Sequence, residues 1–154
     1  MIKYFTNIFP IINLYKKSST KSEIITQMIY GDSFSIIKKY RNWFKIKIKE
    51  DNYKGFIQNK KICSYLKPTH KIKNLKANIY KYPNKRTKII ELTFNSKIKV
   101  IQKKSNFLKF ARGWINQNDV KPCAYKEKNI FKKINIFKNI KYQWGGKSFK
   151  GIDC

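Results

Sequence analysis

The sequence predicts a mainly β protein that contains two small barrels in tandem, followed by a short helix. Three observations lead to this fold class. Short runs of β-branched and aromatic residues alternate with turn residues along most of the chain. Apolar residues and lysines alternate strictly over 44–49, which indicates a half-buried strand. The third observation is that one stretch of the chain repeats another, so the barrels are expected as a pair.

The first barrel is expected within residues 11–66. Its predicted strands are 23–30, 33–37, 43–49 and 54–57, and the breaks between them are Gly31-Asp32, Arg41-Asn42 and Asp51-Asn52. The lysines of 44–49 then form the solvated face of their strand. About five short strands at this spacing are typical of a small barrel.

The second barrel is expected within residues 72–120, because these residues repeat the first. Leu14-Tyr15 corresponds to Ile79-Tyr80, Tyr30-Gly31 to Phe94-Asn95, Trp43-Phe44 to Phe107-Leu108, and Gly55-Phe56-Ile57 to Gly113-Trp114-Ile115. A shortened hairpin accounts for the residues that the second copy lacks between the last two pairs. The Pro-Thr-His segment at 68–70 is the expected connection.

A third segment, 127–154, differs in pattern. Ile130, Ile134 and Phe137 lie at helical separations, which predicts a short amphipathic helix inside 127–140. The chain then reads Tyr-Gln-Trp-Gly-Gly-Lys-Ser-Phe-Lys-Gly-Ile-Asp-Cys over 142–154. Its glycines require tight turns before the thiol of Cys154, an arrangement that displays a nucleophile. The alternative is an ordinary glycine-rich loop whose cysteine has no chemical role.

This tail resembles the active-site segment of the NlpC-type cysteine peptidases, papain-like hydrolases that cut the peptide cross-bridges of bacterial peptidoglycan. The matching residues are Tyr142, Trp144, Gly145, Gly146, Gly151, Asp153 and Cys154. The resemblance implies that Cys154 is the nucleophile at a helix N-terminus, where the thiolate is favoured. It implies that Asp153 contacts the substrate, that the other five residues shape the segment, and that 127–154 begins an α+β papain-like catalytic domain.

The sequence departs from this family in its histidines. A cysteine hydrolase needs an imidazole that takes the thiol proton and a third group that orients the imidazole. The family has both downstream of the cysteine, whereas the single histidine here, His70, lies upstream in an expected loop. We therefore expect a fragment of a longer hydrolase, truncated at its nucleophile and inactive alone. Its helix and tail are expected to be exposed or loosely ordered.

The first barrel region contains a set of spaced matches, namely Asn13-Leu14-Tyr15, Ser22-Glu23, Thr26-Gln27, Tyr30-Gly31-Asp32, Trp43 and Asp51-Asn52-Tyr53-Lys54-Gly55-Phe56. With these residues, 11–66 resemble a bacterial SH3-like domain of the kind fused to NlpC-type peptidases, and 72–120 resemble a less typical second copy. In related enzymes such a domain closes one end of the cleft, so that only a peptide with a free N-terminal L-alanine fits. Tyr53 matches a position that helps to close the cleft. Glu23 is a candidate for meeting the ammonium group of the substrate, with an ordinary solvated carboxylate as the alternative.

The formal charge of +28 raises the question of a nucleic-acid partner, because lysine and arginine release counterions from phosphates. Among the 36 basic residues only Arg41, Arg86 and Arg112 are arginine, the residue suited to bidentate contacts with phosphate and guanine. Lysine, isoleucine, asparagine, phenylalanine and tyrosine all have AT-rich codons. A base-biased genome therefore explains the charge better, and the expected partner is a murein peptide rather than nucleic acid.

Several site types and locations are not expected. Cys63, Cys123 and Cys154 have no spacing typical of a disulfide scaffold or a zinc site, and no metal or cofactor is expected. No apolar stretch reaches the roughly 18 residues of a membrane span, and polar residues interrupt the N-terminus, so a cytoplasmic location is expected. The sequence leaves the oligomeric state open. The alternative function is a non-catalytic SH3-like module that binds cell-wall or polyanionic ligands.

Overall fold

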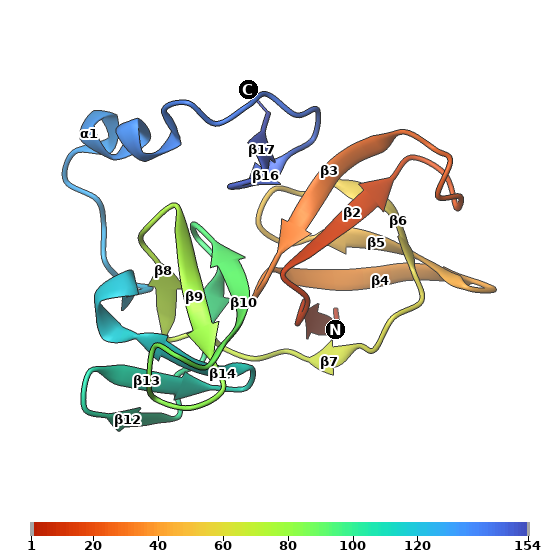
Figure 1. Ribbon diagram of the computed structural model, residues 1–154. Helices are drawn as coiled ribbons and strands as arrows, with labels where there is room; N and C mark the ends of the chain where they lie inside the picture. Colours follow the sequence, from red (N-terminus) through yellow and green to blue (C-terminus); the bar gives the residue numbers. More distant parts are fainter. Residues whose placement is uncertain (1, 154) are drawn as a thin grey trace. The chain divides into compact units, whose positions relative to one another are not determined.

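The computed structural model describes residues 2–153, and the chain divides into two compact units (Figure 1). Unit 1 contains the residues up to Leu66 together with those from Lys141 onward, and unit 2 contains Lys67–Ile140. Both units consist of small β-sheets, and a single α-helix occurs among the described residues. The predicted mainly β fold class is confirmed.

Unit 1 contains one seven-stranded antiparallel sheet with the strand order β3-β2-β6-β5-β4-β1-β7. The strands are β1 (Tyr4–Thr6), β2 (Ile11–Tyr15), β3 (Ile24–Ile29), β4 (Ser33–Tyr40), β5 (Trp43–Ile48), β6 (Lys54–Gln58) and β7 (Cys63–Ser64). The runs predicted as strands within 23–57 are β3 to β6. The outer strands β1 and β7 were not predicted.

The alternation over 44–49 has the predicted structural meaning. Phe44, Ile46 and Ile48 of β5 are buried, while the intervening lysines lie on the opposite face. These apolar side chains pack in one cluster with Leu14 of β2 and Met28 of β3. Since β2 and β3 lie at one end of the strand order and share a core with β5, the sheet must curl around that core.

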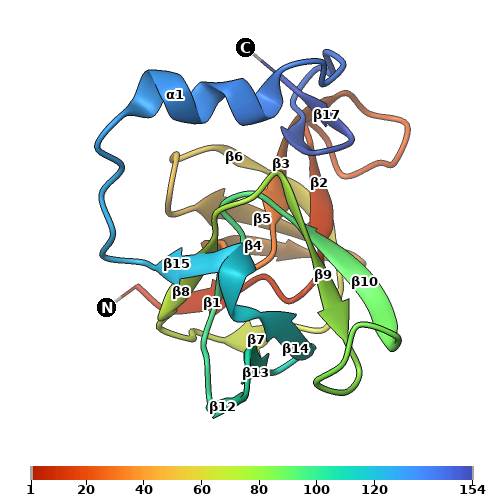
Figure 2. The same cartoon turned by 60° about the vertical axis from the view of Figure 1, so that its left-hand side comes forward.

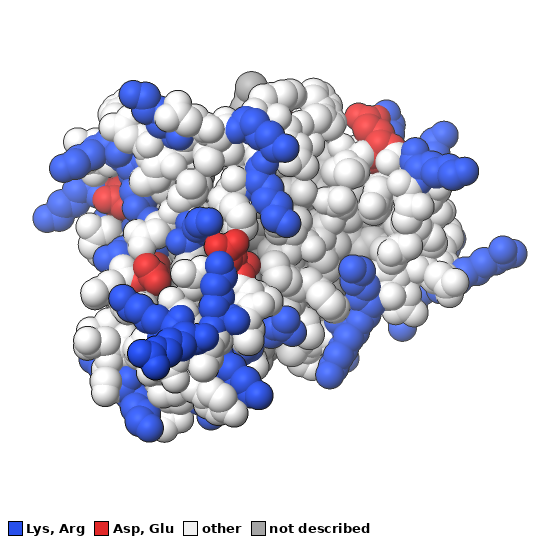
Figure 3. Space-filling view, in the orientation of Figure 1, with Lys and Arg blue, Asp and Glu red and all other residues white. Residues whose placement is uncertain are grey.

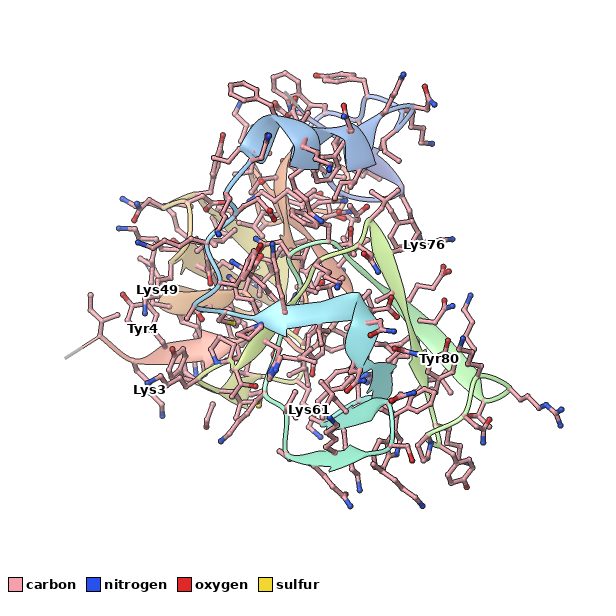
Figure 4. The ribbon with its side chains drawn as sticks, turned by 90° about the vertical axis from the view of Figure 1, so that its left-hand side faces the viewer. Lys3, Tyr4, Lys49, Lys61, Lys76 and Tyr80 are labelled. Atoms are coloured by element: carbon pink, nitrogen blue, oxygen red, sulfur yellow. The ribbon has the colours of Figure 1, made fainter. Side chains whose placement is uncertain are left out.

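Near the other end of the sheet, the strand β1 lies between β4 and the edge strand β7. It pairs with β4, so that Phe5 lies opposite Phe34 with ring centroids 5.8 Å apart. Beside it, the ammonium group of Lys49 lies 4.9 Å from the ring centroid of Tyr4 (Figure 4). The hydroxyl oxygen of Thr6 accepts a hydrogen bond of 2.9 Å from the Leu66 N–H, which links β1 to the last residue of the first segment of unit 1.

Unit 2 contains two sheets, with the strand orders β10-β9-β14-β13-β12 and β11-β8-β15. The strands are β8 (His70–Ile72), β9 (Lys76–Tyr80), β10 (Lys88–Thr93), β11 (Lys97–Ile98), β12 (Gln102–Lys104), β13 (Phe107–Phe110), β14 (Gly113–Asn116) and β15 (Val120–Pro122), with the 3-10 turn η1 (Gln117–Asp119) before β15. Figure 2 shows β15 beside β8, and Lys76 and Tyr80 mark the two ends of β9 in Figure 4.

The strand orders of the two units correspond. The neighbouring strands β3-β2-β6-β5 of unit 1 correspond, strand for strand, to β10-β9-β14-β13 of unit 2. The neighbouring strands β1 and β7 correspond in the same way to β8 and β15. The long strand β4 is replaced by two short strands, β11 and β12. At this break the Val100 N–H donates to the hydroxyl oxygen of Thr69 at 3.0 Å, so that a side chain supplies the acceptor.

The helix predicted inside 127–140 is present and short: α1 (Ile130–Ile134) continues into the 3-10 turn η2 (Asn135–Phe137). The side-chain oxygen of Asn129 caps α1 by accepting a 2.9 Å hydrogen bond from the Lys132 N–H. Phe137 packs edge-on against Phe94, with ring centroids 5.2 Å apart. The side chains of Ile130 and Phe131 remain exposed. No described helix is both long and apolar enough to cross a membrane.

The two barrel tryptophans provide a test of the cores. Trp114 is 8% exposed, whereas Trp43 is only half-buried, and its ring meets that of Tyr15 edge-on with the centroids 5.7 Å apart. Trp114→Ala should lower the free energy of unfolding of its unit by about 3–5 kcal/mol, the cost of deleting a large buried aromatic. Trp43→Ala should cost less than about 2 kcal/mol, because less apolar area is lost. Urea denaturation of both variants measures this difference, and equal losses would contradict the assigned burial.

Candidate functional site

The tail after Lys141 forms a compact hairpin. The strands β16 (Lys147–Ser148) and β17 (Gly151–Ile152) pair with each other, and the Gln143 N–H donates to the Ile152 carbonyl at 2.9 Å. Gly146, Ser148 and Gly151 are buried. Of the expectation of an exposed or loosely ordered tail, exposure holds for Tyr142 and Trp144. The tail backbone, by contrast, has hydrogen-bond partners within the hairpin and elsewhere in unit 1.

The glycines of the tail are required by its geometry. Gly145 has φ of +66°, a left-handed conformation that side chains disfavour. A Cβ at Gly146 would lie 2.5 Å from the carbonyl oxygen of Gly151, closer than any real contact. The close approach of these two backbone segments therefore requires glycine at position 146.

Asp153 closes the hairpin. Its carboxylate oxygen accepts a 2.7 Å hydrogen bond from the Gly145 N–H, and its own N–H donates to the Gly146 carbonyl at 3.0 Å. Both bonds fix the backbone immediately before Cys154. The predicted nucleophile itself, Cys154, lies outside the described residues.

A buried carboxamide attaches the hairpin to the barrel of unit 1. Gln27 on β3 is 5% exposed, and its side-chain oxygen accepts a 3.0 Å hydrogen bond from the Lys147 N–H. Its side-chain N–H donates to the Asn13 side-chain oxygen on β2 at 2.9 Å. The carboxamide thus uses its oxygen for the tail and an N–H for the neighbouring strand.

The side chain of Lys147 makes a second attachment. Its ammonium group forms an ion pair with Asp51 and lies 5.8 Å from the ring centroid of Tyr53. Both partners belong to the turn between β5 and β6, where Asn52 is left-handed and the Tyr53 N–H donates to the Asp51 carboxylate at 3.1 Å. The structure therefore brings the predicted substrate-binding residue Tyr53, which is 50% exposed, to the tail.

The two aromatic residues of the tail pattern are exposed. Tyr142 and Trp144 keep 59% and 61% of their surface accessible. The buried members of the pattern are the three glycines that follow them, Gly145, Gly146 and Gly151. The tail thus presents aromatic faces on a backbone that is packed tightly beneath them.

Glu23 has a different environment from Tyr53. It lies in the loop between β2 and β3, and its carboxylate forms a 3.0 Å ion pair with Lys16. Lys17 and Lys21 line the same loop surface. A half-exposed carboxylate that already has a cationic partner fits the alternative of a solvated surface residue.

His70, the one imidazole in the sequence, lies on β8 of unit 2. Its Nδ1 is 2.9 Å from the hydroxyl oxygen of Thr69, and burial lowers its pKa. The ring is therefore neutral near pH 7. Cys63 and Cys123 are free thiols, and burial raises the pKa of Cys123, which disfavours its thiolate. Residues 2–153 contain no group of three or more metal-ligating side chains.

The sequence pointed to Tyr53 and to the tail but not to what joins them. Gln27, Asp51 and Lys147 form this tether. One signal was available: Gln27 is a polar residue inside an otherwise apolar strand run, and such a residue needs a partner when buried. The identity of that partner depends on tertiary structure, so no sequence pattern could supply it.

Comparisons with known proteins match one domain of the chain by sequence and the described chain by fold. Residues 14–62 match the family model of the bacterial dipeptidyl-peptidase SH3 domain. The fold is similar to that of an NlpC/P60 family protein from Bacillus cereus ATCC 10987, with a TM-score of 0.78 at 15% identity over 99% of this chain and 69% of that one. At this identity the likeness is one of fold alone. No curated protein sequence matches the chain.

Two further structures are more distant. NlpC1 from Trichomonas vaginalis gives a TM-score of 0.35 at 16% identity, over 84% of this chain and 48% of its own. NlpC2 from the same organism gives 0.34 at 15% identity, over 95% and 60%. These scores are too low to establish a shared fold.

The tether can be tested by hydrogen exchange. Gln27→Met removes the acceptor of the Lys147 N–H, so this amide should exchange about tenfold faster, the effect of one lost hydrogen bond of about 1.4 kcal/mol. Asp51→Asn should have a smaller effect, because a half-exposed ion pair contributes about 0–1 kcal/mol. Lys150→Met, an exposed change in the same hairpin, serves as the control. Unchanged exchange of the Lys147 amide in Gln27→Met would refute the tether.

The close approach within the hairpin gives a separate prediction. Gly146→Ala introduces a Cβ against the Gly151 carbonyl and should displace one strand of the hairpin. The Asp153 N–H, which donates to the Gly146 carbonyl, should then lose its protection from exchange. Lys141→Ala, an exposed substitution at the start of the tail, should leave this amide protected. Retained protection in Gly146→Ala would show that the hairpin tolerates a side chain there.

Proposed function

We propose that this chain is part of a peptidoglycan hydrolase that cleaves the γ-D-glutamyl bond to a diamino acid in murein peptides, with Cys154 as nucleophile. The observation that supports this most directly is the attachment of the tail beside Tyr53. The segment that leads to the cysteine and the residue expected to close the substrate cleft are linked through one lysine side chain.

In the proposed reaction the Cys154 thiolate attacks the γ-glutamyl carbonyl carbon. The amide bond breaks, a thioester forms, and the amine of the diamino acid leaves after it gains a proton. Water then hydrolyses the thioester and restores the thiol. Asp153 supports this chemistry by fixing the backbone before the nucleophile through the Gly145 N–H, and we propose that it also contacts the substrate.

The base must be an imidazole that residues 1–154 do not provide. His70 is the single histidine among them, and it belongs to a strand of unit 2 with a hydroxyl partner of its own. An unassisted thiol is only a few per cent thiolate at neutral pH, and it has no acid that protonates the leaving amine. We propose that a histidine and an orienting residue elsewhere in the protein complete the site.

Substrate selection is assigned to the first barrel. Tyr53 has an exposed ring next to the tail, where it can close one end of a cleft against a longer peptide. A free N-terminal L-alanine then becomes a requirement for binding. Glu23 remains the weaker candidate for the ammonium group, because Lys16 already neutralises its carboxylate. The second unit has a strand order that corresponds to that of the first except that β11 and β12 replace β4, and it is proposed as a second SH3-like domain with a wall-binding role.

An activity assay tests this proposal. The full-length gene product should release diaminopimelate from L-Ala-γ-D-Glu-diaminopimelate, and Cys154→Ala should abolish the release. Residues 1–154 alone should show no turnover. Chromatography of the free diamino acid measures all three. Turnover by residues 1–154 alone, or activity that persists in Cys154→Ala, would exclude this assignment.

The alternative function is a non-catalytic module that binds polyanionic ligands. Basic side chains are spread over the face seen in Figure 3, with few acidic groups among them. Binding of this kind should vanish at moderate salt and should not depend on murein peptides. A full-length protein that binds polyanions and never cleaves the peptide would favour this alternative.

A further inference from the structure

Unit 2 contains a cavity of about 550 Å³ between α1, η2, the segment after β15 and the segment after β8. Four lysines line it, namely Lys73, Lys121, Lys132 and Lys133, together with the carboxylate of Glu127 and the ring of Tyr125. Its volume is in the range of small-molecule sites. The cavity takes no part in the proposed peptidase chemistry.

The single carboxylate is already engaged. Glu127 forms a 2.7 Å ion pair with Lys121, whose side chain is only 13% exposed. The ammonium group of Lys121 also lies 4.7 Å from the ring centroid of Tyr125. Glu127 therefore compensates the buried charge of Lys121 and leaves the other lysines of the cavity without a lining carboxylate.

The surroundings of Lys133 in this cavity disfavour its positive charge. Its ammonium group donates to the Lys73 carbonyl oxygen and lies 5.6 Å from the ring centroid of Phe94. Burial lowers its pKa, and the positive charge of Lys121 lowers it further, against the opposite influence of Glu127. The charged form of Lys133 is thus less stable here than in water, and a nearby anion would restore its stability.

We propose that this cavity binds a phosphate group, either free phosphate or a phosphate monoester. Four ammonium groups against one carboxylate give the lining an excess of positive charge in a partly closed space, where charges are weakly screened. Lysines bind phosphate as point charges, and a phosphate group with close to two negative charges near pH 7 gains more from several such charges than a carboxylate with one.

Titration of the protein with inorganic phosphate at low ionic strength tests this, followed by NMR of the backbone amides and lysine side chains. The amides of residues 121–133 should shift and saturate. Lys132→Met/Lys133→Met should weaken binding about tenfold or more, because two charge-assisted contacts are lost. The matched control is Lys126→Met/Lys138→Met, which removes the same charge at exposed positions that do not line the cavity and should bind within about twofold of wild type.

Equal losses in the two double variants, or shifts that never saturate, would overturn the site in favour of general charge attraction. Acetate binding as tightly as phosphate would overturn the phosphate assignment. A further measurement needs no variant and therefore remains possible if the double variant of the cavity does not fold. In the wild-type protein, phosphate should raise the pKa of Lys133. An unchanged pKa of Lys133 at saturating phosphate would also refute the proposal.

Discussion

The carboxamide of Gln27 is the contact on which the arrangement of the tail depends. A buried amide that lacks partners costs about 1–3 kcal/mol, so Gln27 must satisfy its oxygen and its N–H inside the protein. It does so by accepting from the Lys147 N–H and donating to Asn13. A strand of the first barrel and the tail hairpin are therefore linked through one side chain. The tail strand β16 contacts β3, the strand in which Gln27 is buried.

The two units have corresponding strands but differ in the length of one hairpin. In unit 1 the hairpin between β5 and β6 is long enough to carry Asp51 and Tyr53, which meet Lys147. In unit 2 the corresponding strands, β13 and β14, are separated only by Ala111 and Arg112, with Gly113 at positive φ. The short hairpin leaves no room for equivalent side chains. Contacts with the tail of the kind made by Tyr53 therefore belong to the longer hairpin of the first unit.

The sequence predicted a strand correctly where one face of that strand is buried and therefore requires apolar residues. The alternation over 44–49 predicted β5, because burial of Phe44, Ile46 and Ile48 selects apolar residues at every second position. The strands β1 and β7 were missed, because β1 has three residues and β7 has two, too few for a period. The buried position at the end of β1 is polar: Thr6 is 5% exposed and bonds to the backbone of Leu66. The Thr6 hydroxyl takes the place of a backbone acceptor, and a buried polar residue of this kind is not visible in a hydrophobic pattern that predicts strands.

The candidate site was predictable only in its local part. The glycine spacing of the tail follows from backbone geometry, and Gly145 and Gly146 occupy positions that exclude side chains. The ion pairs, by contrast, follow no pattern, because in a chain with 36 basic and 8 acidic residues an exposed carboxylate readily finds a lysine. Pairing alone therefore says little about function. Burial separates the cases: Lys16 beside Glu23 is 64% exposed, whereas Lys121 beside Glu127 is 13% exposed. A buried lysine loses the hydration of its ammonium group, and an exposed carboxylate partner does not offset that loss. The positions of buried ammonium groups are therefore the ones that carry information about a ligand.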